Sequence, residues 1–210
     1  MRPFLFTISS GFIVISVFGL LMLFWPVMVQ EVRYRFIISQ QSTASTESVF
    51  PGFPRGDEWT PPNTIFSIVI PKIDAKAPII PNVDPSDELG YMDALKQGVA
   101  HAMGTCFPGM DCRTYLFAHS TNSSLLVSRY NAVFYLLRKL EPGDQIVIYY
   151  YGKKILYEVI GKGIYPASDT QFIYQRGDEE ELILQTCDPP GTTINRLLVF
   201  ARPKLIEYLR

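Results

Sequence analysis

The stretch LILQTCDPPGTTINRLLVFAR, residues 182–202, carries the strongest structural signal in the chain. It contains two short apolar runs, residues 182–187 and 196–202, of the kind that forms buried β-strands. The segment DPPG follows the first run and favours a turn. We therefore predict two strands joined by a turn, with Cys187 at the end of the first strand and Arg196 at the start of the second.

Six further runs precede this stretch; they are rich in β-branched and aromatic residues, and Gly or Pro often separates them. Gly152-Lys153-Lys154 predicts a hairpin turn between two of them. Segments 84–95 and 130–140 have the pattern of short helices, with Asp84 expected as the N-cap of the first. We expect an all-β dominated body, a barrel or sandwich with short flanking helices. The six runs are residues 64–73, 77–80, 98–103, 114–119, 145–151 and 155–165.

The composition excludes several classes of protein. The 210 residues include 19 Lys+Arg and 20 Asp+Glu, a formal net charge of −1, which argues against nucleic-acid binding as the main function. A hydrophobic fraction of 48% excludes a disordered chain. Three cysteines are too few for a disulfide scaffold, and two histidines provide few ligands for a metal site. Any chemistry must therefore depend on few residues.

The N-terminal region predicts a membrane anchor. Residues 3–30 contain no charged side chain, and as a helix they would extend about 42 Å, more than the ~30 Å of a hydrocarbon core. A cleaved signal peptide is the alternative, but its apolar region would be shorter and would end at a small-x-small cleavage site. We therefore expect residues 1–30 to be a transmembrane anchor.

The next segment, residues 31–63, predicts a flexible linker. It is rich in Ser, Thr and Pro, and few of its residues could pack into a core. Trp59 is the main exception, and the sequence leaves open whether it docks on the protein body or on lipid. The remaining residues, 64–210, are expected to fold as one domain.

The three cysteines divide into a close pair and a single residue. Cys106 and Cys112 lie six residues apart in a loop. They could form a small disulfide or remain as two free thiols. Cys187 is left over, either buried and inert or kept as a reactive thiol. A thiolate that attacks a carbonyl needs a positive group near the oxygen that becomes negative, and Arg196 can face Cys187 across the turn. The proton carrier must be His101 or His119, and periodicity does not choose between them.

These residues and several ordered motifs resemble the sortases, a family of bacterial membrane-anchored cysteine transpeptidases. The resemblance covers roughly residues 65–203 and implies the family's eight-stranded β-barrel. It rests on five blocks: Ile70-Pro71-Lys72-Ile73 with Ala77-Pro78-Ile79; Gly98-Val99-Ala100-His101 with Gly104-Thr105; Phe117-Ala118-His119-Ser120; Phe134, Leu137 and Leu140 with Gly143-Asp144; and Leu184-Gln185-Thr186-Cys187 with Arg196-Leu197-Leu198-Val199.

The resemblance also implies roles for individual residues. Cys187 corresponds to the nucleophile, His119 to the general acid/base, and Arg196 to the group that holds the substrate and the oxyanion. Thr186 and Ala118 are expected to contact the substrate. The connection between the strands that end near Tyr165 and begin near Glu181 is expected to line the groove and set specificity.

The implied reaction cleaves an LPXTG-like sorting signal of an exported protein through a thioacyl enzyme. The acyl group passes to an amine, from a cell-wall precursor or a pilin lysine. The implied location is the cell membrane, single-pass, with the catalytic domain outside the cytoplasm. No cofactor is expected: some family members bind calcium, but the acidic run at residues 178–181 is expected to be a solvated charge run.

Two other functions stay open at this point. A membrane-tethered cysteine hydrolase would use the same three residues with water as the acceptor. An inactive β-domain could act as a binding module. The sortase subclass and the sorting signal are also open.

Overall fold

The computed structural model describes residues 59–120, 133–175 and 177–209, and the isolated residues 16, 18 and 32. Those from Trp59 onward belong to one compact unit, Ser48–Arg210. The predicted anchor and most of the predicted linker lie outside the described residues. Within the described ranges, no helix is long and apolar enough to cross a membrane.

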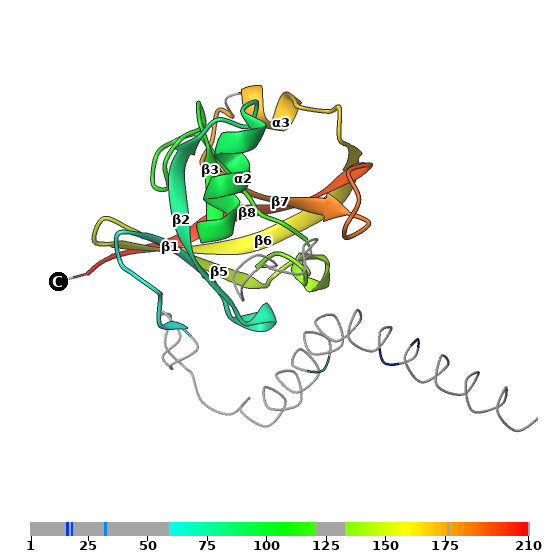
Figure 1. Cartoon of the computed structure of the whole chain (residues 1–210). Coiled ribbons are helices and arrows are strands. Elements are labelled where there is room, and N and C mark those ends of the chain that lie inside the picture. Colours follow the sequence, from blue (N-terminus) through cyan, green and yellow to red (C-terminus); the bar gives the residue numbers. More distant parts are fainter. Residues whose placement is uncertain are drawn as a thin grey trace, which may run out of the picture. The chain divides into compact units, whose positions relative to one another are not determined.

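Eight strands form a closed barrel, which confirms the predicted β-barrel (Figure 1). The strands are β1 (Phe66–Ile70), β2 (Ala75–Val83), β3 (Val99–Ala102), β4 (Arg113–Phe117), β5 (Gln145–Tyr150), β6 (Lys153–Pro166), β7 (Glu181–Asp188) and β8 (Asn195–Tyr208). Their order around the barrel is β1-β2-β3-β4-β7-β8-β6-β5. The β2–β3 and β4–β7 pairs are parallel, and the other pairs are antiparallel.

The β5–β6 connection is the predicted hairpin. Tyr150 pairs with Lys153, so the turn consists of Tyr151 and Gly152. Both have positive φ, 42° and 79°, as the type I′ turn of a two-residue hairpin requires. This turn matches the right-handed twist of the strands that it joins.

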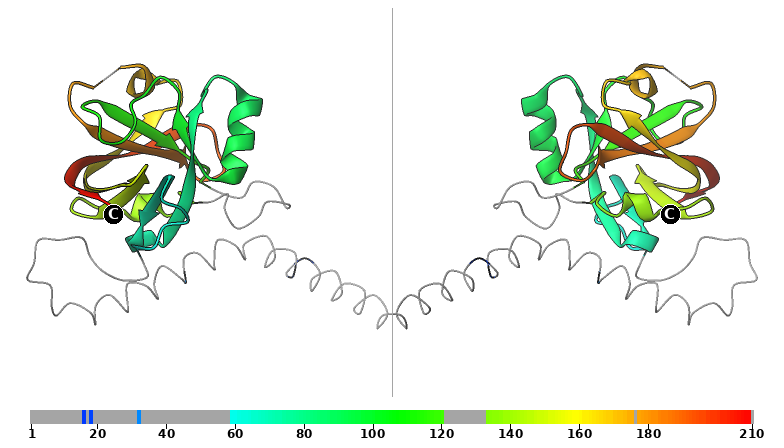
Figure 2. Two further views of the ribbon diagram at one scale, coloured as in Figure 1. Left: turned by 90° about the vertical axis from the view of Figure 1, so that its left-hand side faces the viewer. Right: turned by 90° about the vertical axis from the view of Figure 1, so that its right-hand side faces the viewer.

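The helices and helical turns differ in detail from the sequence prediction. Helix α2 (Glu88–Gln97) lies on the flank of the barrel, as the two views of Figure 2 show. Asp87, not Asp84, occupies its N-cap position, so the predicted start is wrong. The carboxylate of Asp84 instead accepts hydrogen bonds from the backbone N–H and hydroxyl of Ser86, at 2.8 and 2.7 Å. Asp84 therefore stabilises the turn that leads into the helix.

Two segments that were predicted as regular elements form 3-10 turns. The run 64–73 ends as a strand at Ile70, and η2 (Pro71–Ile73) follows, since Pro71 has no N–H for the ladder. Residues 133–140 form turns and η3 (Leu137–Lys139), so the predicted α-helix is wrong in this part; residues 130–132 lie outside the described residues. The apolar face was predicted correctly, because Phe134, Leu137 and Leu140 are fully buried.

Trp59 packs on the protein body, which answers the question that the sequence left open. Its side chain is 7% exposed and belongs to a buried cluster with Val69, Val147, Tyr149 and Leu156. The Tyr149 hydroxyl donates a hydrogen bond of 2.8 Å to the Trp59 carbonyl oxygen. The packed body thus extends beyond the predicted boundary at residue 64.

Candidate active site

Cys187 and Arg196 are direct cross-strand partners at one end of the barrel. β7 and β8 are antiparallel, and their register places Cys187 opposite Arg196. Side chains of directly paired residues point to the same face, with Cβ atoms about 4.5–5.5 Å apart. The nine-residue spacing in the sequence thus becomes a thiol and a guanidinium side by side.

Three hydrogen bonds place the segment that carries His119 beside Cys187. The Ala118 N–H donates to the Gln185 carbonyl at 3.1 Å, and the Thr186 hydroxyl donates to the Ala118 carbonyl at 3.0 Å. Beyond His119, the Ser120 hydroxyl accepts from the Gly191 N–H at 3.3 Å. The segment is therefore tied to the nucleophile strand on one side and to the turn after Cys187 on the other.

One cleft of about 400 Å³ contains all three predicted catalytic residues. Its walls come from α2, from the end of β4, from α3 (Gln171–Tyr174) and from the turn between β7 and β8. The lining includes Glu88, Tyr91, Leu95, Ala118, His119, Ile173, Gln185, Cys187, Thr193 and Arg196. The lining mixes polar and apolar side chains, and it brings the thiol, the imidazole and the guanidinium into one concave site, as a ligand-binding cleft requires.

His119 is half-buried, and this burial lowers the pKa of its imidazole below the ordinary value of 6.5. The neutral ring, which can accept a proton from a thiol, is therefore favoured at neutral pH.

Arg196 has one nitrogen engaged: its Nη1 donates to the carbonyl oxygens of Thr193 and Asn195, at 3.3 and 3.2 Å. No hydrogen bond among the described residues uses its Nε or Nη2. Since a guanidinium has five N–H donors, those groups can serve a substrate oxygen.

Of the two predicted substrate contacts, only Ala118 lines the cleft. Thr186 is 3% exposed, and its side chain faces away from the cleft because strand residues alternate in direction. Its hydroxyl donates a hydrogen bond to the Ala118 carbonyl oxygen. The structure thus gives Thr186 a contact that positions the histidine segment.

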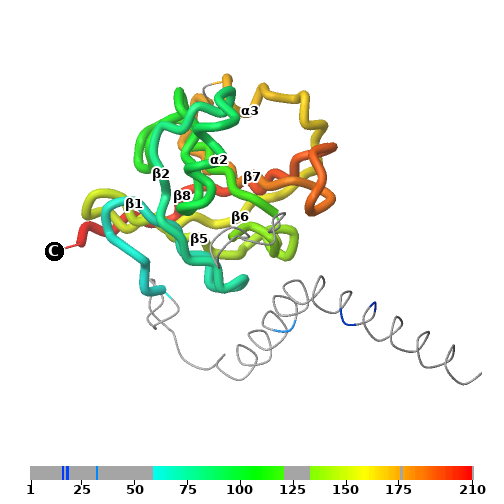
Figure 3. The backbone as a smooth tube through the Cα atoms, viewed as in Figure 1, coloured from blue at the N-terminus to red at the C-terminus, as the bar shows by residue number. Residues whose placement is uncertain are grey.

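The connection between β6 and β7 arches over the barrel wall, as the tube in Figure 3 shows, and carries α3 to the cleft. Three aromatic rings anchor it: Phe172 of α3 contacts Tyr165 and Phe200, with centroid distances of 4.7 and 5.8 Å. Gly163 permits this arrangement, because a Cβ there would lie 2.8 Å from the Tyr165 ring. The predicted groove-lining connection is therefore held by packing on β6 and β8.

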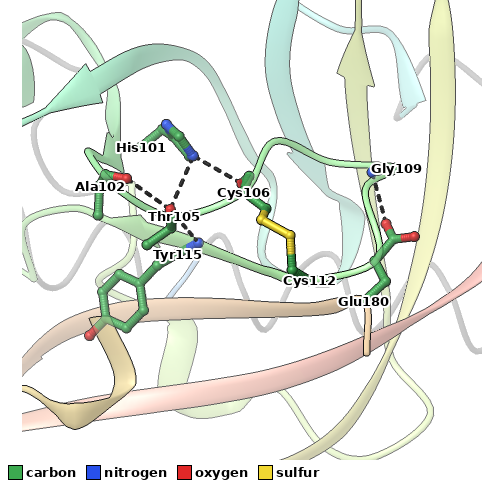
Figure 4. Close-up of a disulfide and its surroundings, with 8 residues drawn as sticks. All are labelled: His101, Ala102, Thr105, Cys106, Gly109, Cys112, Tyr115 and Glu180. Atoms are coloured by element: carbon green, nitrogen blue, oxygen red, sulfur yellow. Dashed lines mark hydrogen bonds between the residues drawn. A yellow bond between two sulfur atoms is a disulfide. The ribbon is translucent and has the colours of Figure 1, made fainter. Parts of the chain in front are cut away.

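Cys106 and Cys112 form a disulfide in the loop between β3 and β4 (Figure 4). His101 lies beside this loop, fully buried, and is not a cleft residue. Its Nε2 donates to the Cys106 carbonyl at 3.0 Å, and its Nδ1 accepts from the Asn82 N–H at 3.2 Å. His101 is thus a neutral structural histidine whose pKa is lowered by burial.

The acidic run at residues 178–181 is solvated in its first half, as expected, because Asp178 and Glu179 are exposed, whereas Glu180 and Glu181 are half-buried and paired. Glu181 forms an ion pair with Arg113 at 2.8 Å, and Glu179 lies 3.6 Å from Arg202. Glu180 accepts hydrogen bonds from the Tyr157 hydroxyl and the Gly109 N–H, at 2.6 and 2.9 Å. Within the part of the chain that the structure describes, no group of three or more His, Cys, Asp or Glu side chains could hold a metal ion.

The structure adds cleft residues that the sequence reasoning missed. Gln185 lies two residues before Cys187, so strand alternation alone would have placed it on the same face. Tyr91 of α2 also lines the cleft, with its ring edge-on to Phe117 at 6.3 Å. Burial raises the pKa of the Tyr91 phenol, and the charge of Glu88 adds to the rise while Arg196 opposes it. No local pattern in the sequence indicates that Tyr91 lines the cleft.

Comparison with known proteins agrees with this geometry. A family model described as the sortase domain matches residues 68–204. Sortase D of Bacillus subtilis (strain 168) is 29% identical over 136 residues, 63% of this chain and 60% of that protein.

Solved structures agree as well. Sortase C1 of Streptococcus suis superimposes with a TM-score of 0.55 at 27% identity, covering 67% of this chain and 73% of that one. A sortase D5 transpeptidase of Clostridium perfringens shares the fold, with a TM-score of 0.55 at 21% identity and coverage of 85% and 95%. With the family model matched over most of the barrel, the chain belongs to the sortase family.

Proposed function

We propose that the protein is a membrane-anchored cysteine transpeptidase that cleaves an LPXTG-like sorting signal and transfers the acyl part to an amine. The observation that supports this most strongly is the pairing of Cys187 with Arg196 in one cleft with His119. The family relationship supports the general activity. The sorting signal and the acceptor are expectations carried over from the resemblance.

The first half of the proposed reaction forms a thioester. His119 takes the proton from the Cys187 thiol, and the sulfur attacks the peptide carbonyl carbon. The carbonyl oxygen becomes negative and is stabilised by the free donors of Arg196. When the C–N bond breaks, His119 returns the proton to the leaving amine, and the acyl group stays on Cys187.

The second half reverses this sequence with a new amine. The amine nitrogen attacks the thioester carbon and gives its proton to His119, while Arg196 again faces the oxyanion. The C–S bond then breaks, and the proton returns to the Cys187 sulfur. The products are a new amide bond and the free enzyme.

The remaining parts of the proposal concern location and partners. The uncharged segment 3–30 supports an anchor, residues 31–63 a linker and residues 64–210 the catalytic domain outside the cytoplasm. Exported proteins with a sorting signal would be the donors, and a cell-wall precursor or a pilin lysine would supply the amine. No cofactor and no nucleic acid enters this scheme.

The intact mass of the protein incubated with LPXTG-like peptides tests the proposal. We expect an acyl adduct on Cys187 that disappears when an amine is added, with formation of a ligated peptide. Discharge to the free acid at a rate independent of the amine would indicate a hydrolase instead. A Cys187 thiol that forms no adduct with the peptides and does not react with a generic thiol probe would indicate a binding module.

A further inference from the structure

Gln185 is one of the polar side chains that line the cleft and that the proposed chemistry does not use, and it lies nearest to Cys187 along β7. It lies on β7 on the same face as Cys187, and the two residues are about 6.6–6.8 Å apart along the strand. A peptide whose carbonyl carbon lies at the Cys187 sulfur therefore has a neighbouring residue within reach of Gln185.

A buried tyrosine fixes the orientation of the Gln185 amide. The Tyr115 hydroxyl donates a hydrogen bond of 2.6 Å to Gln185 Oε1. Tyr115 is 2% exposed, and in Figure 4 its ring points away from the disulfide loop. Burial raises the pKa of this phenol well above its ordinary value, so the hydroxyl remains a donor at every physiological pH.

The hydrogen bond from Tyr115 determines which end of the Gln185 amide is available to a ligand. Because Oε1 accepts from Tyr115, the two N–H groups of Nε2 are the part of the amide that is left for a ligand. No hydrogen bond between described residues engages Nε2. A half-buried amide donor without a protein partner is favourable only when a water or a ligand supplies the acceptor.

We propose that Gln185 determines specificity by donating hydrogen bonds from Nε2 to a carbonyl oxygen of the bound peptide, near the bond that Cys187 attacks. Tyr115 is the positioning residue that orients the amide. The acceptor is either a side-chain amide carbonyl, as in Asn or Gln, or a backbone carbonyl of the extended peptide. This inference rests on the proposed peptide substrate, whose class it narrows.

Pairs of peptides that differ only by Asn or Leu test the inference, because these side chains have nearly the same shape. The full-length chain would be assayed with LPXTG peptides in which each of the three positions before Thr carries Asn or Leu. We expect one position to prefer Asn over Leu by roughly tenfold in kcat/KM, the size expected for one satisfied hydrogen bond. Gln185→Leu would bring this ratio close to one.

The variant also distinguishes the two sources of the acceptor. If the acceptor is a backbone carbonyl, Gln185→Leu lowers kcat/KM for every peptide by a similar factor and leaves the Asn/Leu ratios unchanged. If neither the ratios nor kcat/KM change by more than about twofold, the inference is wrong. Gln145→Leu is the matched control, since Gln145 begins β5 and does not line the cleft.

The role of Tyr115 needs a readout that a loss of packing would not change. Tyr115→Phe keeps the ring and removes the donor, and we expect it to weaken peptide discrimination by raising KM rather than lowering kcat. In a Gln185→Leu background the same change should have no further effect on discrimination. Equal effects of Tyr115→Phe in both backgrounds would contradict positioning through Gln185.

Failure of this inference can be separated from failure of the proposed function. Binding of the same Asn and Leu peptides to Cys187→Ala protein, measured by fluorescence polarisation, requires no turnover. A difference in Kd that disappears in the Gln185→Leu/Cys187→Ala double variant supports the inference even if no thioacyl adduct forms. Kd values that do not differ between the Asn and Leu peptides and that Gln185→Leu leaves unchanged would overturn it.

Discussion

Arg196 faces Cys187 across the β7–β8 pair, and its free donors make it the group with the clearest expected effect on rate. Loss of one oxyanion donor typically raises the barrier by about 2.7–4 kcal/mol. We therefore expect Arg196→Ala to slow formation of the thioacyl adduct at least a hundredfold, measured by intact mass over time. Among the described residues the half-buried Arg196 side chain bonds only to the carbonyls of Thr193 and Asn195, so the free energy of unfolding measured in urea should change little. An acylation rate close to that of the wild type would refute the role of Arg196.

Thr186 has its expected effect through His119 rather than through the substrate. Thr186→Val keeps the shape and removes the hydrogen bond to the Ala118 carbonyl, leaving that buried oxygen without its donor. We expect a loss of about 1–3 kcal/mol in the free energy of unfolding, together with slower acylation. Thr186→Ser should restore both quantities in large part. If Thr186→Val changed only the KM for peptide, Thr186 would be a substrate contact as the sequence suggested.

At the scale of elements, the β6–β7 connection is the part of the site whose position depends on packing. Phe172 is the side chain of α3 that contacts both Tyr165 and Phe200. Phe172→Ala should detach α3 from the barrel wall and raise the KM for peptide, while the barrel stays folded. Tyr208→Ala is the control, since Tyr208 is 70% exposed near the end of β8. Equal KM values for the two variants would show that α3 does not shape the peptide site.

Among the elements, the sequence could predict the strands but not every helix and turn. Runs of β-branched and aromatic residues located all eight strands, because alternation and composition are local properties. The start of α2 and the 3-10 turn at Leu137 were missed, because Asp84 and the apolar spacing fit more than one local structure. Strand ends also shifted, and β2 extends to Val83 because pairing with β3 adds residues that propensity does not favour.

For the site, the sequence could identify groups near one another along the chain but not groups joined by the fold. Cys187 and Arg196 share a hairpin, so their spacing was informative. His119 could be chosen over His101 only through the family resemblance, since both lie near the end of a β-like run. The structure separates them, because His119 lines the cleft while His101 bonds to Asn82 and Cys106. Long-range contacts made by the barrel decide this difference, and periodicity does not report them.

For the whole molecule, the two histidines predict a loss of stability on acidification. Burial lowers the pKa of both imidazoles in the folded protein, while the unfolded chain binds their protons near pH 6.5. Stability is therefore fully present above pH 6.5 and falls as the pH decreases below it. His101, which is fully buried, can account for up to about 1.4 kcal/mol at pH 5.5, and the more exposed His119 for less.

Urea unfolding at pH 7.5 and pH 5.5 measures this loss, and the interval avoids most carboxylate titration. His119→Asn should keep most of the decrease, because His101 remains. A free energy of unfolding that stays constant or rises on going from pH 7.5 to pH 5.5 would contradict the burial argument.

The disulfide and the cleft lie at opposite ends of β7, which suggests that stability and chemistry can be separated. Gly109 of the Cys106–Cys112 loop donates a hydrogen bond to Glu180, the residue just before β7, whereas Cys187 lies near the other end of the strand. A disulfide that closes a loop of this size contributes about 2–3 kcal/mol by restricting the unfolded chain.

We expect the Cys106→Ser/Cys112→Ser double variant to unfold at a lower temperature and to retain most of its acylation rate. Cys187→Ala should abolish acylation and leave the unfolding temperature nearly unchanged. Thiol counting under denaturing, non-reducing conditions should find one free thiol in the wild type. Three free thiols, or loss of acylation in a double variant that is still folded at the assay temperature, would show that the disulfide does not act as a remote stabiliser.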